Sequence, residues 1–348
     1  RRISSLLISV KYNDYKICGY QQRYGGFAYV ECIGEVEVVL KVRGLNKTYN
    51  KLKALDALDM NIERGSIYGL VGQNGAGKTT LMRSFDSGDI EIYNMDMKKQ
   101  YSGIKEKIAF IPDSFAYHYN ITVEEYMEFF ASCYGFEGLR ARQRYTKLLQ
   151  MLSLDDKMQS LVGSLSRGMQ QRLSLARALI NDPDFIIMDE PTSGLDPKTN
   201  YSFKELIRQL NSEDRTILIS SHMLSELSEV CTDIGVIDHG HMVIESSLSD
   251  ILSKFNNTNP IKIRIMGNED KAFKIFKEDV NVRHVSAREG IFFIKFTGTK
   301  RDEAALLKKL VAEDIPVSEF MREEAKLETF FMDITASNKE RIIIENDY

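Results

Sequence analysis

A glycine-rich segment that directly follows a buried apolar run constrains the fold most. Residues 66–71 (SIYGLV) are typical of a buried strand, and residues 72–80 (GQNGAGKTT) fit the pattern G-x-x-x-x-G-K-[ST]. Glycines let successive backbone N–H groups point inward around a triphosphate, and a helix that starts here directs its positive end at the anion. The pattern predicts a strand–loop–helix unit for a nucleotide, with Lys78 on the β- and γ-phosphates and Thr79 on magnesium.

A second apolar run, residues 185–190 (FIIMDE), ends in two acids. Taken alone, a strand that ends in Asp-Glu is more often structural, but downstream of a phosphate loop it is typical of a hydrolytic site. We expect Asp189 to hold magnesium, through water, and Glu190 to orient or deprotonate the attacking water.

Short β-rich runs alternate with helical patterns after residue 36, as a parallel α/β architecture requires. Strands are expected at residues 36–45, 66–71, 107–111, 184–188 and 216–220. Between residues 123 and 154 the pattern is helical, because Tyr126, Phe129, Phe130 and Cys133 recur about every 3.6 residues. The sequence therefore predicts a helical insert within an α/β domain.

The two ends of the chain differ from this domain. Residues 1–36 are an ordered strand pair, a flexible extension or translated sequence upstream of the true start, and we favour the last two. After a polar linker, strands are expected at residues 261–265 and 290–296 and helices at residues 271–277 and 301–312. We expect an extension of unknown role at 1–36, an α/β domain at 37–255 with a helical subdomain at about 113–175, and a small α+β domain at 256–348.

Charge and hydropathy exclude two classes of protein. Lys and Arg number 46 and Asp and Glu 50, so the formal net charge is -4 and no overall basic field gathers nucleic-acid phosphates. No apolar stretch approaches the roughly 18 residues that a membrane-spanning helix needs. The four cysteines lack metal-ligand or redox spacing, which is typical of reduced thiols in a cytosolic protein. We expect no nucleic-acid partner, and membrane contact only through a partner protein.

Three further motifs complete a family pattern. Residues 165–172 (LSRGMQQR) precede an apolar helix, residues 193–197 (SGLDP) follow the two acids, and His222 follows the strand expected at 216–220. With these motifs in order, residues 37 to about 245 resemble the nucleotide-binding subunit of ATP-binding-cassette (ABC) transporters. The resemblance implies an ABC-type P-loop ATPase domain, α/β with a mixed-sheet core and a helical subdomain, followed by the small C-terminal α+β domain.

The resemblance assigns roles to individual residues. Tyr49 matches the aromatic residue that stacks on adenine, and the alternative is a buried tyrosine at a strand end. Lys78, Glu190 and His222 match the catalytic residues, with His222 holding the γ-phosphate and the water. The residues that match the ATP-binding loop are Gly72, Gln73, Asn74, Gly75, Ala76, Gly77, Lys78, Thr79 and Thr80.

The LSRGM motif implies a site that two chains share. Ser166, Arg167, Gly168 and Met169 match the signature that contacts the γ-phosphate bound to the opposite subunit, so that only a head-to-tail dimer has a complete site. Asp196 matches the loop that communicates across this dimer. A monomer is therefore expected to hydrolyse ATP poorly.

The chain departs from the family pattern in three places. Asp113 stands where the family usually has glutamine; it can still contact magnesium or water, but it adds negative charge. Arg167 replaces the first of two glycines, and Met169 replaces the usual glutamine. The helix after the phosphate loop has room only for residues 79–85, which span roughly 10 Å. Either this segment is short or residues are missing from the sequence, and we favour the second, because so short a helix would expose the adjacent sheet.

The sequence thus predicts the ATP-hydrolysing subunit of an ABC exporter, with ATP and Mg²⁺ as cofactors. Residues 165–172 and 327–335 (LETFFMDIT) resemble the drug-resistance and bacitracin-type exporter ATPases, which pair with a separate membrane protein. The expected partners are a transmembrane permease and a second copy of the chain, at the cytoplasmic face of the cell membrane. The cargo (peptides, lipids or drugs) and the direction of transport stay open. The alternatives are a non-transport ABC ATPase in DNA or translation processes, and a regulatory protein that binds ATP without turnover.

Overall fold

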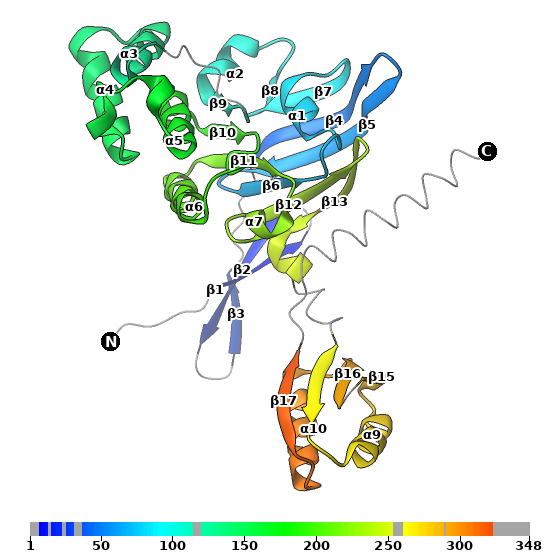
Figure 1. Ribbon diagram of the computed structural model, residues 1–348. Coiled ribbons are helices and arrows are strands. Elements are labelled where there is room, and N and C mark those ends of the chain that lie inside the picture. Colours follow the sequence, from blue (N-terminus) through cyan, green and yellow to red (C-terminus); the bar gives the residue numbers. More distant parts are fainter. Residues whose placement is uncertain are drawn as a thin grey trace. The chain divides into compact units, whose positions relative to one another are not determined.

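Five apolar runs in the first part of the chain pair as a parallel sheet. Its strands are β6 (Ile67–Val71), β9 (Ile108–Ile111), β10 (Phe185–Met188), β11 (Thr216–Ser221) and β12 (Asp233–Asp238), in the spatial order β12-β6-β11-β10-β9, with β13 (His241–Ser247) beyond β12. Every residue of β6 is buried, because a central strand covered on both faces has no solvent-facing side. Since the strands share one direction, the segments that follow β6, β10 and β11 meet at one edge of the sheet (Figure 1).

The chain divides into two compact units, residues 1–245 and 246–348. The computed structural model describes residues 7–12, 15–22, 26–30, 37–113, 120–252, 260–288 and 290–322. Residues 253–259, where the predicted linker begins, lie outside this set, and the predicted division at residue 255 stays a prediction. None of the helices in these described ranges combines the length and the apolar character needed to cross a bilayer.

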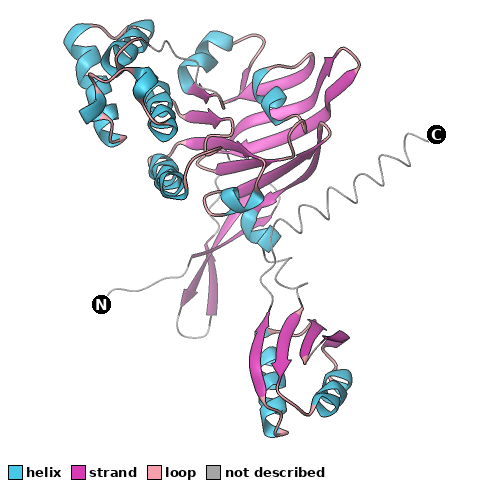
Figure 2. Ribbon diagram, in the orientation of Figure 1, coloured by secondary structure: helices cyan, strands magenta, loops and turns pink. Residues whose placement is uncertain are grey.

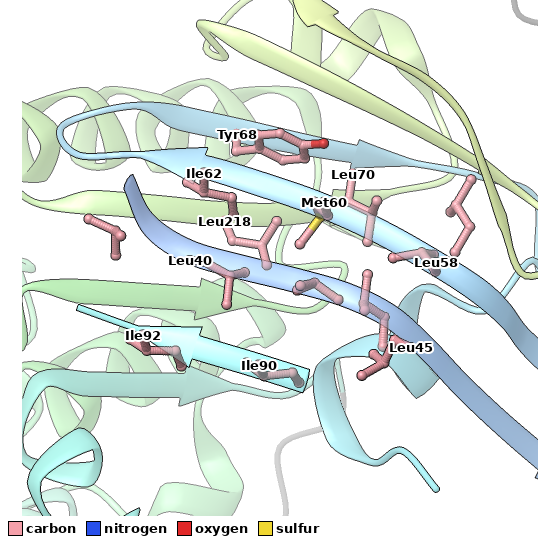
Figure 3. Close-up of a cluster of buried hydrophobic side chains, with 14 of the residues drawn as sticks. Leu40, Leu45, Leu58, Met60, Ile62, Tyr68, Leu70, Ile90, Ile92 and Leu218 are labelled. Carbon is pink, nitrogen blue, oxygen red and sulfur yellow. The ribbon is translucent and has the colours of Figure 1, made fainter. Parts of the chain in front are cut away.

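An antiparallel sheet packs on the parallel one. Its strands, in spatial order, are β5 (Leu52–Glu63), β4 (Val38–Tyr49), β7 (Ser87–Ile92) and β8 (Met95–Asp96). Figure 3 shows Leu40, Met60 and Ile90 of this sheet in one buried cluster with Leu70 of β6 and Leu218 of β11. One core cluster of the first unit therefore lies between two sheets. The mixed-sheet α/β fold predicted from the sequence is confirmed.

The helices of the first unit include the predicted insert. They are α1 (Lys78–Arg83), α2 (Tyr101–Lys107), α3 (Val123–Cys133), α4 (Gly138–Met151), α5 (Arg167–Ala178), α6 (Pro197–Ser212) and α7 (Leu224–Ser228), with 3₁₀ turns at Asp155–Lys157, Val162–Ser164 and Leu179–Asn181. Helices α3, α4 and α5 pack on one another (Figure 1). The helix predicted here is present, and its buried residues include Val123, Tyr126 and Met127, whereas Phe129 is 61% exposed and Cys133 is exposed. The spacing of Tyr126, Phe129, Phe130 and Cys133 thus indicated the helix but does not mark its buried face.

Helix α3 begins with a reciprocal pair of hydrogen bonds at Thr122. The backbone N–H of Thr122 donates to Oε2 of Glu125 at 2.7 Å, and the N–H of Glu125 donates to the Thr122 hydroxyl at 3.2 Å. Both bonds satisfy N–H groups that a helix end leaves without partners. The N–H and the hydroxyl of Thr122 both donate to the Glu125 carboxylate and hold the pKa of Glu125 below its ordinary value. Thr299 and Asp302 form the same box at the start of α10 (Lys300–Ala312) in the second unit.

Replacing Thr122 by alanine is expected to lower the free energy of unfolding of the first unit by about 1 kcal/mol, because one helix-start N–H loses its acceptor. Urea unfolding followed by circular dichroism measures this change. The Thr299→Ala variant removes the matching cap of the second unit and should shift that unit's transition instead. Equal midpoints for the wild type and Thr122→Ala would contradict the contribution assigned to this cap.

The N-terminal segment contains three paired strands. They are β1 (Leu7–Tyr12), β2 (Tyr15–Gln22) and β3 (Gly26–Val30), which form an antiparallel sheet in that order. The preference for a flexible extension is therefore wrong for these residues, whereas their origin as translated sequence upstream of the true start stays a hypothesis.

Helix α1 is as short as the sequence indicated. Its 6 residues, Lys78–Arg83, span about 9 Å at 1.5 Å per residue. Leu81 is nevertheless buried, and Met82 and Phe85 pack against the core cluster. The short helix thus covers part of the adjacent sheet, and the suggestion that residues are missing after it stays a hypothesis.

The described residues 260–288 and 290–322 of the second unit form an antiparallel sheet that is joined by two helices. In spatial order its strands are β15 (Val282–Arg288), β16 (Ile291–Phe296), β14 (Ile261–Ile265) and β17 (Val317–Arg322), and its helices are α9 (Glu269–Glu278) and α10. Along the chain the order is β-α-β-β-α-β, the split βαβ arrangement. Figure 2 shows the strands of this unit in magenta and its helices in cyan. Ile263, Phe276 and Leu310 are fully buried in one core between sheet and helices. The predicted α+β fold of this region is confirmed, whereas residues 327–335 lie outside the described residues.

Candidate functional site

The loop between β6 and α1 has an unusual backbone. It leaves β6 at Val71 and enters α1 at Lys78. Gly75 and Gly77 have φ values of 86° and 113°, in the region that glycine adopts without steric cost. A turn with such residues can present successive N–H groups to one side, which forms a concave anion-binding surface. The loop therefore has the geometry that the sequence pattern predicted.

Two glycines of this loop lie directly against backbone carbonyl groups. A Cβ atom on Gly72 would lie 2.5 Å from the carbonyl oxygen of Ile237 in β12. A Cβ atom on Gly77 would lie 2.6 Å from the carbonyl oxygen of Ala54 in β5. Since backbone atoms cannot move aside as a flexible side chain can, neither position has room for a side chain. Strands β5 and β12 thus fix the path of the loop.

Lys78 is held over the loop by three oxygen atoms. Its side chain is buried, and its Nζ donates to the carbonyl oxygen of Gly72 at 2.6 Å and to that of Gln73 at 3.3 Å. The same Nζ lies 3.3 Å from Oε1 of Glu190. A buried ammonium group is stable only when such partners surround it. The charge of Lys78 is therefore fixed beside the phosphate loop.

Asp189 follows β10 and is fully buried. Its Oδ1 accepts hydrogen bonds from the hydroxyl groups of Thr79 at 3.2 Å and Ser220 at 2.8 Å. Its Oδ2 has no hydrogen-bond partner among the described residues, and Nη2 of Arg83 lies 3.6 Å away. A buried carboxylate oxygen beside a threonine hydroxyl fits Mg²⁺, which proteins hold with one or two carboxylates, substrate phosphates and waters. The donor set of Thr79 and Asp189 thus suits this ion.

Glu190 and His222 form a hydrogen-bonded pair. Nδ1 of His222 lies 2.8 Å from Oε2 of Glu190. Glu190 has a φ of 47°, which is uncommon for a residue with a side chain, and its N–H donates to the hydroxyl of Ser220 at 2.8 Å. Such strained positions concentrate at functional sites. The carboxylate, the imidazole and the Lys78 ammonium therefore form one connected group that can move a proton.

Ser220 and Arg83 both lie against Asp189, and sequence reasoning missed both. Ser220 bonds Asp189 and the Glu190 backbone from the neighbouring strand β11, and the signal for it was a small hydroxyl residue near the end of a predicted strand. Nη2 of Arg83 lies 3.1 Å from Oδ1 of Asp113. The structure therefore places Asp113 in an ion pair with Arg83, and its proposed contact with magnesium stays a prediction.

A cavity of about 320 Å³ joins these groups. Loop residues between Gln73 and Thr80 line one wall, and the other lining residues are Asp113, Arg167, Glu190, Ser193 and His222. The structure thus brings the phosphate loop, the catalytic candidates and one signature residue to a single cavity. Its size suits the phosphate chain of a nucleotide, and its lining offers both cations and a proton acceptor.

In this chain Ser166 and Asp196 cap helices, and Gly168 packs against Thr199. Ser166 caps α5 by accepting a hydrogen bond from the N–H of Met169 at 3.4 Å, and Gly168 is buried where a Cβ atom would lie 2.4 Å from Cγ2 of Thr199. Asp196 caps α6, and hydrogen bonds from the hydroxyl and the N–H of Thr199 hold the pKa of Asp196 below its ordinary value. Ser166 and Gly168 are not among the residues that line the described cavity of this chain.

Tyr49 lies at the end of β4 with its ring 48% exposed. Its hydroxyl lies 3.1 Å from that of Ser84, the residue after α1, and Nζ of Lys47 lies 5.0 Å from the ring centroid. The alternative of a buried strand-end tyrosine is therefore wrong. An exposed ring beside the helix that follows the phosphate loop is available for stacking on a base.

Comparison with known proteins identifies a family that carries this set of motifs. The family described as "ABC transporter" matches residues 55–193. The bacitracin transport ATP-binding protein BcrA of Bacillus licheniformis is 30% identical over 305 residues, which cover 85% of this chain and 97% of that protein. The linearmycin resistance ATP-binding protein LnrL of Bacillus subtilis is 27% identical over 305 residues, which cover 85% of this chain and 98% of that protein.

Solved structures agree with these relatives. The ATP-binding subunit of an ABC transporter is 26% identical and superposes with a TM-score of 0.56 over 62% of this chain and 93% of that one. A dimeric ATP-binding cassette bound to ADP and Pi, in a post-hydrolysis state, is 26% identical with a TM-score of 0.55, over 60% of this chain and 98% of that one. The phosphate loop, the acids after β10 and the overall likeness to these proteins lead to one conclusion: this chain belongs to the ATP-binding proteins of the ABC transporter family.

Proposed function

We propose that this chain is the ATP-hydrolysing subunit of an ABC exporter, in which two copies form a head-to-tail dimer and drive a separate transmembrane permease. The observation that carries the proposal is the connected group of Lys78, Glu190 and His222 around one cavity beside the phosphate loop. Membership of an ATPase family supports the hydrolysis of ATP. To drive a permease, the chain would bind it at the cytoplasmic face of the membrane.

The names of the relatives support export. They include proteins of bacitracin transport, linearmycin resistance and Nod factor export. We propose cargo of the same broad kind, namely peptides, lipids or drugs, which the permease subunit would contact. The same names give no support to a role in DNA or translation processes or to a purely regulatory ATP-binding protein.

In the proposed mechanism the phosphate loop binds ATP through its backbone N–H groups. The Lys78 ammonium exchanges its carbonyl partners for β- and γ-phosphate oxygens, and the exposed Tyr49 ring stacks on the adenine. Thr79 and Asp189 would hold Mg²⁺, with Asp113 as a further candidate ligand. When bound, that ion neutralises the charge of the phosphate oxygens.

Hydrolysis then needs a group that takes a proton from water. The carboxylate of Glu190 accepts this proton as the water oxygen attacks the γ-phosphorus, and the bond between that phosphorus and the bridging oxygen of ADP breaks. His222 orients Glu190 through its Nδ1 contact, and its other nitrogen would hold the γ-phosphate. ADP and inorganic phosphate are the products.

The dimer would complete the site. We propose that Ser166, Gly168 and Met169 contact the γ-phosphate held by the opposite chain and that Asp196 lies near the contact between the chains. The dimeric post-hydrolysis cassette among the relatives supports this assembly. Residues 37–255 would form the nucleotide-binding domain, residues 256–348 an accessory domain, and residues 1–36 an extension of unknown role.

A tagged copy of the protein, purified gently from solubilised membranes, tests the proposal. We expect one polytopic membrane protein at a one-to-one ratio, identified by mass spectrometry, and ATP hydrolysis by the purified complex. A strain that expresses the tag alone is the control. Recovery of the chain only from the cytosol, alone or with soluble partners, would contradict the transport role and favour a non-transport ATPase.

A further inference from the structure

Arg167 differs from the rest of the signature in its surroundings. It is the first residue of α5, its side chain is exposed, and no hydrogen bond or ion pair of its guanidinium occurs within the described parts of the chain. It lines the cavity of its own chain together with the phosphate loop, whereas Ser166 and Gly168 do not line it. A cation without a partner among these residues thus borders the site that would receive a triphosphate.

The guanidinium of Arg167 lies against the backbone of Gly194. A Cβ atom on Gly194 would lie 2.7 Å from Nη1 and 2.9 Å from Cζ of Arg167, so the guanidinium rests on the backbone of the turn at residues 193–194. Gly194 has a φ of 70°, a conformation that glycine favours. Ser193 of the same turn lines the cavity, and its N–H donates to the carbonyl oxygen of Glu190 at 3.2 Å. The turn on which the Arg167 guanidinium lies is therefore hydrogen-bonded to Glu190, one of the catalytic candidates.

Charge in the cavity favours an anion as the partner of Arg167. The carboxylate of Glu190 already has Lys78 and His222 within 3.3 Å, and Asp113 is paired with Arg83. The acids of the cavity therefore have cationic or imidazole neighbours before any ligand binds. A guanidinium offers a planar set of donors that matches phosphate oxygens, often with two parallel hydrogen bonds.

We propose that Arg167 binds the terminal phosphate of the nucleotide held in its own chain, rather than the nucleotide of the opposite chain. The terminal phosphate is favoured over the others because the turn at residues 193–194, on which the guanidinium of Arg167 lies, is hydrogen-bonded to Glu190, the proposed base for attack on the γ-phosphorus. This assignment rests on the proposed ATPase function and differs from the role that the family resemblance gives to the whole signature. It makes Arg167 a binding residue in each monomer, before any dimer forms.

Nucleotide affinity of the full-length chain, at a concentration where it is monomeric, tests the assignment. We expect Arg167→Ala to weaken ATP binding about 3- to 10-fold, because an exposed charge-assisted contact is lost, and to change ADP binding less than about 2-fold. Arg167→Lys should retain part of the ATP affinity. Arg140→Ala, which removes an exposed arginine of α4 outside this cavity, should bind both nucleotides like the wild type.

Mixed dimers distinguish binding of Arg167 to the nucleotide of its own chain from binding to the nucleotide of the opposite chain. A mixture of Lys78→Ala and Ser166→Ala chains should regain ATPase activity, because one intact loop meets one intact signature serine across the dimer. At an ATP concentration well below the wild-type dissociation constant, a mixture of Lys78→Ala and Arg167→Ala chains should regain about 3- to 10-fold less activity, because each cavity lacks one of its own residues.

Equal recovery in both mixtures would overturn the proposal, as would an ATP affinity of Arg167→Ala within 2-fold of the wild type. An equal loss of ATP and ADP affinity would also overturn it, because the terminal phosphate would not be the partner. Failure of the wild-type chain to bind ATP would instead contradict the proposed function itself, and the Arg167 assignment with it.

Discussion

Replacing Glu190 by glutamine is expected to lower the rate of ATP hydrolysis by about 10²- to 10⁴-fold, the contribution typical of a general base. Glutamine has the same size and can keep a hydrogen bond with His222, but its amide cannot take the proton of the attacking water. Single-turnover hydrolysis of ATP by the purified protein measures the rate. The affinity for ATP should change little, because Glu190 is proposed to act on the water.

A matched control separates this effect from a loss of negative charge in general. Glu205 is an exposed glutamate of α6 that pairs with Arg208, and Glu205→Gln should hydrolyse ATP like the wild type. If Glu190→Gln turned ATP over at the wild-type rate, the proton-transfer step proposed for Glu190 would be wrong. Binding and family membership would then still stand, but another group would have to activate the water.

Replacing Lys78 by alanine is expected to weaken ATP binding by about 10- to 150-fold, the range for loss of hydrogen bonds to a charged group. The effect is larger than at an exposed site because Lys78 is 5% exposed, so water screens its charge poorly. The variant also leaves Glu190 without its ammonium neighbour, so hydrolysis should fall further than binding. Equilibrium titration with ATP gives the dissociation constant.

Lys204 provides the control for burial. It is 6% exposed, pairs with Glu229 at 2.8 Å and is not among the residues that line the cavity beside the phosphate loop. Lys204→Ala should therefore reduce the free energy of unfolding and leave ATP affinity unchanged. Similar ATP affinities for Lys78→Ala and the wild type would contradict the role of this lysine, whatever the stability of the variants.

Strand β5 shows why part of the fold escaped the sequence analysis. Its buried residues are Leu55, Leu58, Met60 and Ile62, so that the spacing is three residues once and two thereafter. Ala57 has a φ of 45° at an irregular stretch of the pairing with β4, and this bulge adds one residue to the strand. The buried residue before the bulge therefore has an odd number, and those after it have even numbers. Strict alternation therefore does not reveal the strand. Strand β6, buried throughout, shows an unbroken apolar run and was located correctly.

The candidate site divides in a similar way. The phosphate loop, Asp189 and Glu190 stood out in the sequence because each directly follows an apolar strand and belongs to a local pattern, whereas His222 was assigned only through the family resemblance. The structure brings these residues close to one another, and their roles stay predictions. Ser220 and Arg83 could not be predicted as site residues, because their contacts depend on which strands are neighbours in the sheet. No short segment of the sequence indicates the order of the strands. The same limit explains Asp113, whose ion-pair partner comes from a helix 30 residues earlier in the chain.

The carbonyl groups of Ala54 and Ile237 that press on Gly77 and Gly72 bear on the thermodynamics of nucleotide binding. Because two neighbouring strands already fix the loop, its conformational entropy is lost when the protein folds and not when ATP arrives. Affinity for the nucleotide therefore depends partly on how rigidly β5 and β12 are held. Changes in their packing, far from any phosphate, would alter the cost of binding without removing a single contact to the ligand.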